Sequence, residues 1–293
     1  MSRPEISVCV PAYQAERYLA QTLRSVLTQS FRDFELLVLD NACTDRTPEI
    51  LREFRHPRLR VVRNSQVLPV AENWNRAIAL SSAPLVKLVC ADDLLHPRCL
   101  ERQYAVLSKD PGLALVCSRR TMINEESRPM SRNRGLRGLL GRQPSRDVVR
   151  KIVRHGGNPL GEPAGALFRR EQFDAVGGFD GRWSFPMDLA LWIRLLEHGD
   201  FYGMRESLAA FRVTRGSLSA VLSSPGYTEQ RTLSDELATA PEWDVRKRDR
   251  LVGAAKAPGA RLRRQALFLV ARAQAHRAET ETTGRTEPPE RGM

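Results

Sequence analysis

Long hydrophobic runs are missing from this sequence of 293 residues. No window approaches the roughly 18 uninterrupted apolar residues that suggest a membrane-spanning helix. The N-terminal segment MSRPEISVCVPAY has an apolar stretch that is too short, and too soon broken by Pro11, for a signal peptide. We therefore expect neither a transmembrane helix nor a secretion signal, and we interpret this stretch as a first β-strand.

Paired cysteines are missing too. The five cysteines are odd in number, scattered and never spaced as CxxC, at Cys9, Cys43, Cys90, Cys99 and Cys117. This distribution argues against a disulfide framework or a cysteine-built zinc site. It favours reduced thiols in a cytoplasmic protein.

The glycine-rich motifs that cradle phosphates are also absent from the sequence. The chain has no GxxxxGK[ST], and no GxGxxG follows a predicted strand. The spaced glycines of GLRGLLG lie in a basic segment that we interpret as a flexible loop. No GxSxG is found, and the five histidines show no ligand spacing such as HExxH. A P-loop NTPase and a Rossmann dehydrogenase are therefore disfavoured.

Positive charge is abundant, with a net charge of +12, and it is concentrated in two blocks. Residues 119–154 carry eleven Lys and Arg against three Asp and Glu, and residues 246–277 carry ten against one. The blocks indicate either a local anionic partner or arginines on solvated faces. Neither block contains Trp or Tyr for base stacking, so we predict no nucleic-acid partner.

The second basic block contains a helical pattern, RLRRQALFLVARAQ. Leu262, Leu267, Phe268 and Ala271 lie among its arginines. Such a helix could lie on an anionic membrane surface, or it could cover the rest of the protein with its apolar stripe. We prefer the second interpretation, which leaves open a peripheral contact of a cytoplasmic protein with the inner face of the membrane.

Strand-like and helix-like segments alternate along the first 118 residues. Strands that alternate with helices indicate βαβ units, and hence an α/β fold with a mainly parallel sheet flanked by helices. Parallel strands are buried on both faces, which explains their continuous apolar character. The predicted strands are EISVCVP, FELLVLD, LRVVRN, PLVKLVC and LALVCS.

The alternation lapses after residue 118. Residues 119–157 are polar, basic and contain Gly and Pro, so we predict an excursion or a mobile loop. Order returns over 158–220 with GALFRREQFDAVGGFD, the apolar helix MDLALWIRLLEHG, and the strands FYGM and SLAAFRVT. We predict C-terminal helices over 221–277 and, because apolar residues are few, a disordered tail over 278–293.

Two adjacent carboxylates, Asp92 and Asp93, follow the predicted buried strand within LVCADDLLHP. Like charges at roughly 4 Å repel by about 1 kcal/mol in water and by more at a protein surface, so a positive group is expected beside them. Mg²⁺ and Mn²⁺ suit such a place, because they combine one or two carboxylates with substrate phosphates. The alternative is that either residue caps the following helix. Asp40, after the second strand, is likewise either a turn former or an acceptor for a base edge.

Three segments together resemble the family-2 inverting glycosyltransferases of the GT-A fold. They are ISVCVPAYQAERYLAQTLRSVLTQSFRDFELLVLDNACTDRT, ENWNRAI with APLVKLVCADDLLHPRCL, and GEPAGALFRREQFDAVGGFDGRWSFPMDLALWIRLLEHG. The resemblance covers about residues 4–220 and depends on the order and spacing of these segments. It implies a GT-A domain over 1–220, with a donor half over about 1–118 for a nucleotide-diphosphate sugar and an acceptor half over 158–220. A C-terminal helical extension would follow.

In the donor half, the resemblance implies that Pro11 and Tyr13 flank the nucleobase, although Tyr13 could equally be a core aromatic. Asp40 would accept a hydrogen bond from the edge of the base. Asp92 would lie near the ribose, and Asp93 would coordinate a Mn²⁺ or Mg²⁺ that bridges the diphosphate.

In the acceptor half, Asp188 occupies the place of the family's general base, with an N-cap of its helix as the alternative. Met187 stands where the family usually has an acidic residue. Trp192, one turn on, would line the acceptor side. In FRVTRGSLS, Arg212 would meet the diphosphate, and Thr214 stands where many relatives carry His.

The segment GGNPLGEPAGALFRR lies between the basic excursion and the acceptor helix. We predict that its Asn158 and Glu162 contact acceptor or sugar hydroxyls. The simpler alternative is a turn made by its glycines and prolines.

The resemblance implies metal-dependent, inverting transfer of a sugar. We expect a UDP-sugar as the donor, rather than a GDP- or dTDP-sugar, only because UDP is the commoner nucleotide. The acceptor would be a hydroxyl of a glycan, a lipid carrier or a small natural product. Direct displacement requires a base within reach of that hydroxyl and charge stabilisation on the departing diphosphate. One alternative is a nucleotidyltransferase, which would need a Gly-rich basic loop where VPAYQAERYL stands. The other is a basic module that binds a membrane surface or nucleic acid without catalysis.

Overall fold

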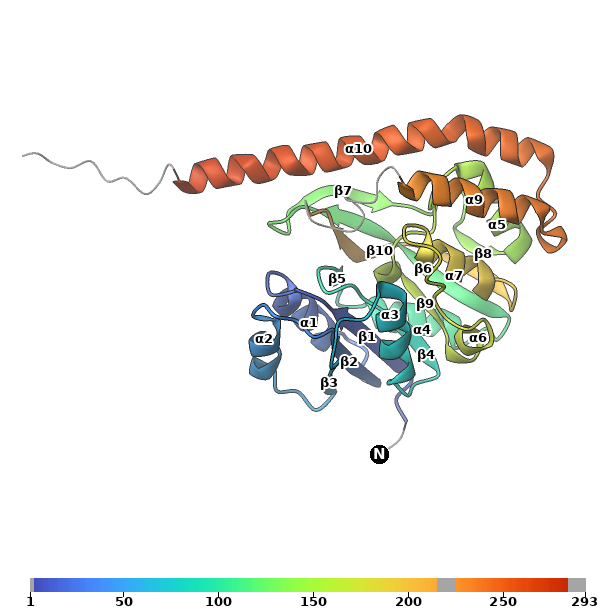
Figure 1. Ribbon diagram of the computed structural model, residues 1–293. Coiled ribbons are helices and arrows are strands. Elements are labelled where there is room, and N and C mark those ends of the chain that lie inside the picture. The colour runs from blue at the N-terminus through green and yellow to red at the C-terminus, as the bar shows by residue number, and fades with distance from the viewer. Residues whose placement is uncertain (1–2, 215–224, 284–293) are drawn as a thin grey trace, which may run out of the picture.

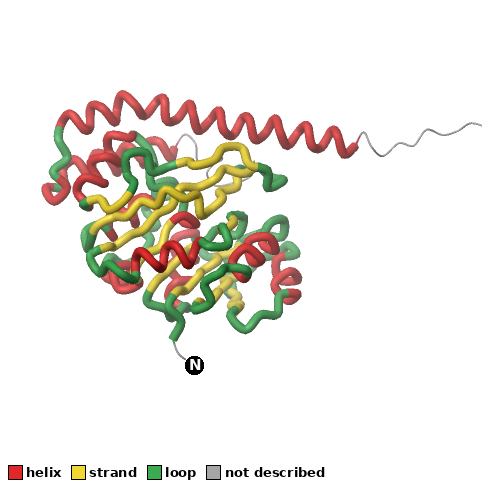
Figure 2. Tube along the Cα trace, turned by 180° about the vertical axis from the view of Figure 1, so that it is seen from behind, coloured by secondary structure: helices red, strands yellow, loops and turns green. Residues whose placement is uncertain are grey.

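One mixed sheet forms the centre of the molecule (Figure 1). The computed structural model describes residues 3–214 and 225–283. Within them the strand order is β3-β2-β1-β4-β9-β6-β10-β5, with β7 beside β6 and β8 beside β10. Helices cover both faces of the sheet, as Figure 2 shows from behind. The predicted α/β class is confirmed.

The N-terminal half of the sheet is parallel, as predicted for the donor half. Its strands β1 and β4 are buried along their whole length, because helices pack on both of their faces. The edge strand β3 is partly exposed instead. The elements are β1 (Ile6–Ala12), α1 (Leu19–Leu27), β2 (Phe34–Asp40), α2 (Thr47–Glu53), β3 (Leu59–Arg63), α3 (Val70–Ala79) and β4 (Leu85–Leu88).

The sheet continues with strands of both directions. β9 runs antiparallel to its neighbours β4 and β6, whereas β6 and β10 are parallel to each other. The carboxyl ends of β1, β2, β4, β6 and β10 therefore lie at the same edge. The elements are β5 (Leu94–Leu95), α4 (Cys99–Leu107), β6 (Leu113–Ile123), β9 (Ala166–Arg169), α6 (Arg170–Ala175), α7 (Met187–Leu195) and β10 (Asp200–Arg212).

The loop or excursion predicted for residues 119–157 is instead largely regular structure. β6 continues to Ile123, and a hairpin returns as β7 (Pro129–Arg134) before β8 (Gly141–Gln143) and α5 (Ser145–His155). The hairpin pairs its polar residues with β6, a tertiary contact that local composition does not reveal. α5 buries one apolar face made by Val148, Val149, Ile152 and Val153. The loop prediction was therefore wrong.

The C-terminal helices are α9 (Pro225–Thr239) and α10 (Lys247–Thr283), joined by the short 3₁₀ turn η2 (Pro241–Trp243). This confirms the helical prediction over the described residues. The helix extends to Thr283, so the prediction of disorder was wrong for 278–283, and the remainder of that predicted tail lies outside the described residues. Within the described chain, no helix combines the length and apolar character needed to cross a membrane.

A buried carboxylate fixes α10 to α5. Asp249 is fully buried and accepts hydrogen bonds from Arg150 (3.2 Å) and Arg154 (3.3 Å). The two helices approach so closely that a Cβ at Gly253 would lie 2.1 Å from the carbonyl oxygen of Val153. Beyond this contact α10 runs past β7 and extends beyond the sheet (Figure 1).

Candidate active site

The end of β1 places one predicted nucleobase contact inside the sheet and the other on the surface. Pro11 is buried and pairs with Leu39 of β2. Tyr13 follows the strand and is 54% exposed. The alternative of Tyr13 as a core aromatic is therefore wrong.

Asp40, at the end of β2, shapes the turn that follows it. Its Oδ1 accepts a hydrogen bond of 2.8 Å from the backbone N–H of Cys43. Its Oδ2 forms an ion pair with Arg63, which also donates to the carbonyl oxygen of Cys43 (2.9 Å). The structure thus supports the interpretation of Asp40 as a turn former. Both of its carboxylate oxygens already have partners, so a hydrogen bond from a nucleobase would be one more for the same oxygens to accept.

The Asp92 and Asp93 pair forms a tight turn after β4 and does not cap a helix. The backbone N–H of Asp93 donates to the carbonyl oxygen of Cys90 (3.0 Å), and β5 follows directly. Helix α4 begins only at Cys99, with Arg98 at its N-cap position. The helix-cap alternative for the two aspartates is therefore wrong.

Asp93 is fully buried, and only one of its two carboxylate oxygens is satisfied. Oδ1 accepts a hydrogen bond of 3.0 Å from the backbone N–H of Arg212, whereas Oδ2 has no partner among the described residues. Burial raises the pKa of the Asp93 carboxyl well above its usual range, and the Asp92 carboxylate raises it further. A cation would favour the ionised form and reverse this shift.

The residues at this turn fit a divalent cation. One ligand atom each from Cys90, Asp92 and Asp93 lies within 4.8 Å of the others. The unpartnered buried oxygen of Asp93 and the nearby Asp92 carboxylate can hold an ion that prefers oxygen ligands and accepts phosphate oxygens from a substrate.

Arg212 lies beneath this turn and is fully buried. Its guanidinium lies over the ring of Tyr18, with the central carbon 4.2 Å from the ring centroid. Its N–H groups donate to the backbone carbonyl of Asp92 (2.8 Å) and to acceptors on Asn124 (3.1 Å), Ser127 (2.9 Å) and Gln21 (3.0 Å). These contacts support the Asp92–Asp93 turn from within, and they do not support the predicted direct contact with a diphosphate.

Asp188 lies in the first turn of α7 and is half-buried. Pro186 occupies the N-cap position, so the N-cap alternative for Asp188 is wrong. Its Oδ1 accepts from the backbone N–H of Leu189 (2.7 Å), and its Oδ2 accepts from the side-chain amide of Asn158 (3.3 Å). The positive end of the helix dipole also stabilises a carboxylate at this position.

Asn158 organises the loop before β9 as well as contacting Asp188. Its Oδ1 accepts from the backbone N–H groups of Leu160 (3.0 Å) and Gly161 (2.9 Å), and its amide donates to the carbonyl oxygen of Gly161 (3.2 Å). The turn interpretation of this segment is therefore correct, and Asn158 additionally links the turn to Asp188.

Glu162 has a partner that the sequence did not reveal. It forms an ion pair with Arg120 of β6, and a second guanidinium nitrogen lies 3.3 Å from its other oxygen. Both side chains are mostly buried. Gly135 and Gly161 have positive φ angles and leave room for the guanidinium, since a Cβ at either would lie within 2.6 Å of Arg120 Nη1. Only the basic composition of residues 119–154 hinted at such an arginine.

Carboxylates from the predicted donor and acceptor halves both act on the thiol of Cys90. Burial raises the pKa of its thiol well above the usual range, and the carboxylates of Asp93, Asp92, Asp188 and Glu162 raise it further. Residues from the predicted donor and acceptor halves therefore act electrostatically on one place.

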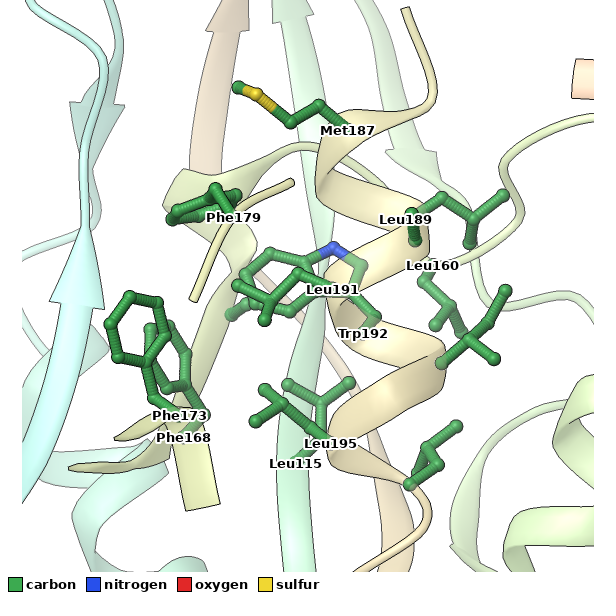
Figure 3. Close-up of a cluster of buried hydrophobic side chains, with 14 of the residues drawn as sticks. Leu115, Leu160, Phe168, Phe173, Phe179, Met187, Leu189, Leu191, Trp192 and Leu195 are labelled. Atoms are coloured by element: carbon green, nitrogen blue, oxygen red, sulfur yellow. The ribbon is translucent and has the colours of Figure 1, made fainter. Parts of the chain in front are cut away.

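Trp192 does not belong to this group, and its predicted contact with an acceptor was wrong. It is fully buried, 5.5 Å from the ring of Phe168 and 6.4 Å from that of Phe179 between centroids (Figure 3). Almost every residue of α7 is buried, so the face one turn beyond Asp188 packs on the sheet.

Comparisons with known proteins identify the family and the fold. The model of the family "Glycosyl transferase family 2" matches residues 7–177. MT1568 of Mycobacterium tuberculosis is 29% identical over 204 residues, which cover 67% of this chain and 63% of that protein.

Two solved structures share the fold at low sequence identity. TarS of S. aureus in complex with UDP-GlcNAc has a TM-score of 0.64 at 17% identity, covering 86% of this chain and 71% of that one. A mannosyltransferase of Pyrobaculum calidifontis in complex with GDP-Man and Mn²⁺ has a TM-score of 0.64 at 20% identity, covering 97% and 80%. The matched family region covers more than half of the chain and most of its sheet. The chain therefore belongs to glycosyl transferase family 2 and is a glycosyltransferase of the GT-A fold.

Proposed function

We propose that this glycosyltransferase moves a sugar from a nucleotide-diphosphate donor to an acceptor hydroxyl in one metal-dependent, inverting displacement. The observation that carries this proposal is the contrast between two carboxylates, Asp93 and Asp188, that both act electrostatically on Cys90. Asp93 is buried with an unpartnered oxygen, and Asp188 is half-buried at the start of a helix. The first suits a cation and the second suits a base.

The donor lies along the ends of β1, β2 and β4 in this proposal. Pro11 and Tyr13 flank the base, and Asp40 accepts a hydrogen bond from its edge. Asp92 lies near the ribose, and Asp93 holds Mn²⁺ or Mg²⁺. The ion, when bound, neutralises charge on the departing diphosphate. A UDP-sugar is our preferred donor, supported by the UDP-GlcNAc complex of TarS. The GDP-Man complex of the Pyrobaculum calidifontis mannosyltransferase supports a GDP-sugar as the alternative.

Asp188 is the general base in this proposal. Its carboxylate accepts the proton of the acceptor hydroxyl as the oxygen forms a bond to the anomeric carbon. The bond from that carbon to the diphosphate oxygen breaks at the same time, and the nucleoside diphosphate leaves. Attack from the face opposite the leaving group inverts the anomeric configuration. Asn158 holds the carboxylate in place, at 3.3 Å from Oδ2.

The acceptor is a hydroxyl of a glycan, a lipid carrier or a small natural product. Glu162 and Asn158 are the groups that we propose to contact acceptor or sugar hydroxyls. Because Arg120 and the loop backbone already bind them, they would present a fixed rather than a flexible surface.

We also propose that α10 contacts an anionic membrane surface at the cytoplasmic face. Leu251, Leu262 and Leu269 are 71%, 65% and 62% exposed, and their spacing places them on one side of the helix. The preferred sequence interpretation, an apolar stripe that covers the protein, is thus wrong at Leu262. The side chains of Leu267, Phe268 and Ala271 lie outside the described set. Asp249 is the only acidic residue among the cations of 246–277, and it is buried.

Calorimetric titration tests the donor site. Purified protein is titrated with UDP, GDP and dTDP, each with Mn²⁺ and with EDTA, alongside Asp93→Ala. We expect metal-dependent binding of one nucleotide that is lost in the variant. Binding that survives both EDTA and Asp93→Ala would contradict the proposed role of Asp93, and binding of none of the three would contradict the donor site.

A further inference from the structure

Cys90 stands apart from the other cysteines. It lies between the end of β4 and the Asp92–Asp93 turn, and its side chain is partly accessible, whereas the other four cysteines are buried. Its thiol forms no hydrogen bond with any described residue, whereas the thiol of Cys9, for example, donates to the carbonyl oxygen of Ala77 at 3.6 Å. The proposed function gives Cys90 no role.

The geometry around Cys90 is that of a metal-ligand set. Its sulfur and one carboxylate oxygen each from Asp92 and Asp93 lie within 4.8 Å of one another. Metal–sulfur bonds of about 2.3 Å and metal–oxygen bonds of about 2.1 Å allow two ligands of one ion to lie up to about 4.4 Å apart. Small rotations of the Cys90 and Asp92 side chains would therefore let all three atoms bind one ion.

A second observation points to a ligand at the same place. Asp93 is fully buried, and its Oδ2 has no hydrogen-bond partner among the described residues. Its Oδ1 is held by the backbone N–H of Arg212, so the carboxylate has a fixed orientation. A buried, ionised carboxylate oxygen without a hydrogen-bond donor destabilises the folded protein unless a cation binds it.

We propose that the sulfur of Cys90 coordinates the divalent cation together with Asp93, with Asp92 in reach as a third ligand. This inference rests on the proposed function for the presence of the cation. The thiol gives up its proton to solvent as the metal–sulfur bond forms. Thiolate is a soft ligand that Mg²⁺ binds poorly, whereas Mn²⁺, Co²⁺ and Zn²⁺ accept it more readily. The site therefore selects transition-metal ions over Mg²⁺.

Cobalt provides a spectroscopic test that does not require turnover. The full-length protein is titrated with Co²⁺, with and without UDP, and the near-ultraviolet spectrum is recorded for the thiolate-to-cobalt charge-transfer band. We expect the band in the unmodified protein and its loss in Cys90→Ser, with Co²⁺ affinity lowered at least about tenfold. Cys9→Ser is the matched control, because the partners of that buried thiol, Ala77 and Ser81, also suit a hydroxyl, and it should retain the band.

The outcomes separate this inference from the proposed function. Co²⁺ binding measured by calorimetry without a charge-transfer band would overturn sulfur coordination and leave the metal-dependent donor site intact. No Co²⁺ binding with or without UDP would overturn both. A band that persists in Cys90→Ser would assign the sulfur to another cysteine and also overturn the inference.

Metal preference gives a second measurement that remains informative if Cys90→Ser is unstable. Cys90→Asp replaces the soft ligand with a hard one and should raise the affinity for Mg²⁺ relative to Mn²⁺ by about tenfold or more. An unchanged ratio of the two affinities, measured by competition calorimetry, would count against sulfur coordination.

Discussion

Two acidic residues, one from the predicted donor half and one from the predicted acceptor half, differ in how the protein compensates their charge. Asp93, on the donor side, is fully buried with one backbone hydrogen bond and one unpartnered oxygen. Glu162, on the acceptor side, is paired with the guanidinium of Arg120. The fold thus supplies its own cation, Arg120, to Glu162, whereas one oxygen of Asp93 has no partner among the described residues.

Asp188 represents a third arrangement. It is half-buried and accepts hydrogen bonds from the backbone N–H of Leu189 and from the side-chain amide of Asn158. These hydrogen bonds orient the carboxylate. In the proposed function, these three environments correspond to three roles: Asp93 binds a cation, Glu162 is fixed by Arg120, and Asp188 accepts a proton.

The largest effect is expected from Asp188→Asn. The amide keeps the shape and can still bond Leu189, but it cannot take a proton, so turnover should fall about 10³-fold. Nucleotide binding should stay unchanged, because the substitution leaves the proposed donor contacts, including Asp93, as they are. Turnover and calorimetry together measure this, with the exposed Asp174→Asn on α6 as control. A turnover close to that of the unmodified protein would remove Asp188 from the role of base.

The Arg120–Glu162 pair should show the next largest effect, on stability. Arg120→Gln leaves a mostly buried carboxylate without its cation, so the free energy of unfolding should fall by about 3 kcal/mol. Arg102→Gln is the matched control. Its pair with Glu206 is about half-exposed at both side chains, and its loss should cost about 1 kcal/mol or less.

A double-mutant cycle with Glu162→Gln separates this pairing from a general effect of the substitution. If the two residues interact directly, the double variant should be more stable than the sum of the single changes predicts. Additive losses in urea denaturation would show that Arg120 stabilises the protein through other contacts.

The parts of the site that the sequence predicted have local causes. Asp92 and Asp93 follow an apolar run, and Asp188 follows Pro186 at the start of an apolar helix, so their places at element ends are visible without the fold. The parallel donor half is similarly explained by its alternating apolar strands and amphipathic helices. Family resemblance then assigned roles that position alone left open.

The parts that failed depend on contacts between distant residues. Trp192 was placed one turn from Asp188, but which face of α7 meets solvent is decided by the sheet that covers it. Arg212 was predicted to face a diphosphate, yet its partners Gln21 and Ser127 come from elements far away in the sequence. Arg120 and Glu162 are 42 positions apart, so nothing local indicated their pairing.

Asn158→Ala tests the hydrogen bond that orients Asp188. Loss of one hydrogen bond to a charged group costs about 1.5 kcal/mol, so turnover should fall roughly tenfold if the bond positions the base. The Kd of the nucleotide should not change, because the hydrogen bonds that Asn158 makes with described residues go to Asp188 and to its own loop. A rise in the nucleotide Kd at constant turnover would place Asn158 on the donor side and remove this distinction between the two halves.

The smallest effect is expected outside the site, on α10. Replacing Leu262 with Ser removes one exposed apolar side chain, and partial burial of such a side chain in a lipid surface is worth about 1 kcal/mol. Binding to anionic phospholipid vesicles should therefore weaken about fivefold, and nucleotide binding should not change. Val67→Ser, at an exposed valine of the donor half, is the matched control. Equal vesicle binding by the two variants would contradict a membrane role for α10, and binding to neutral vesicles alone would contradict the part assigned to its arginines.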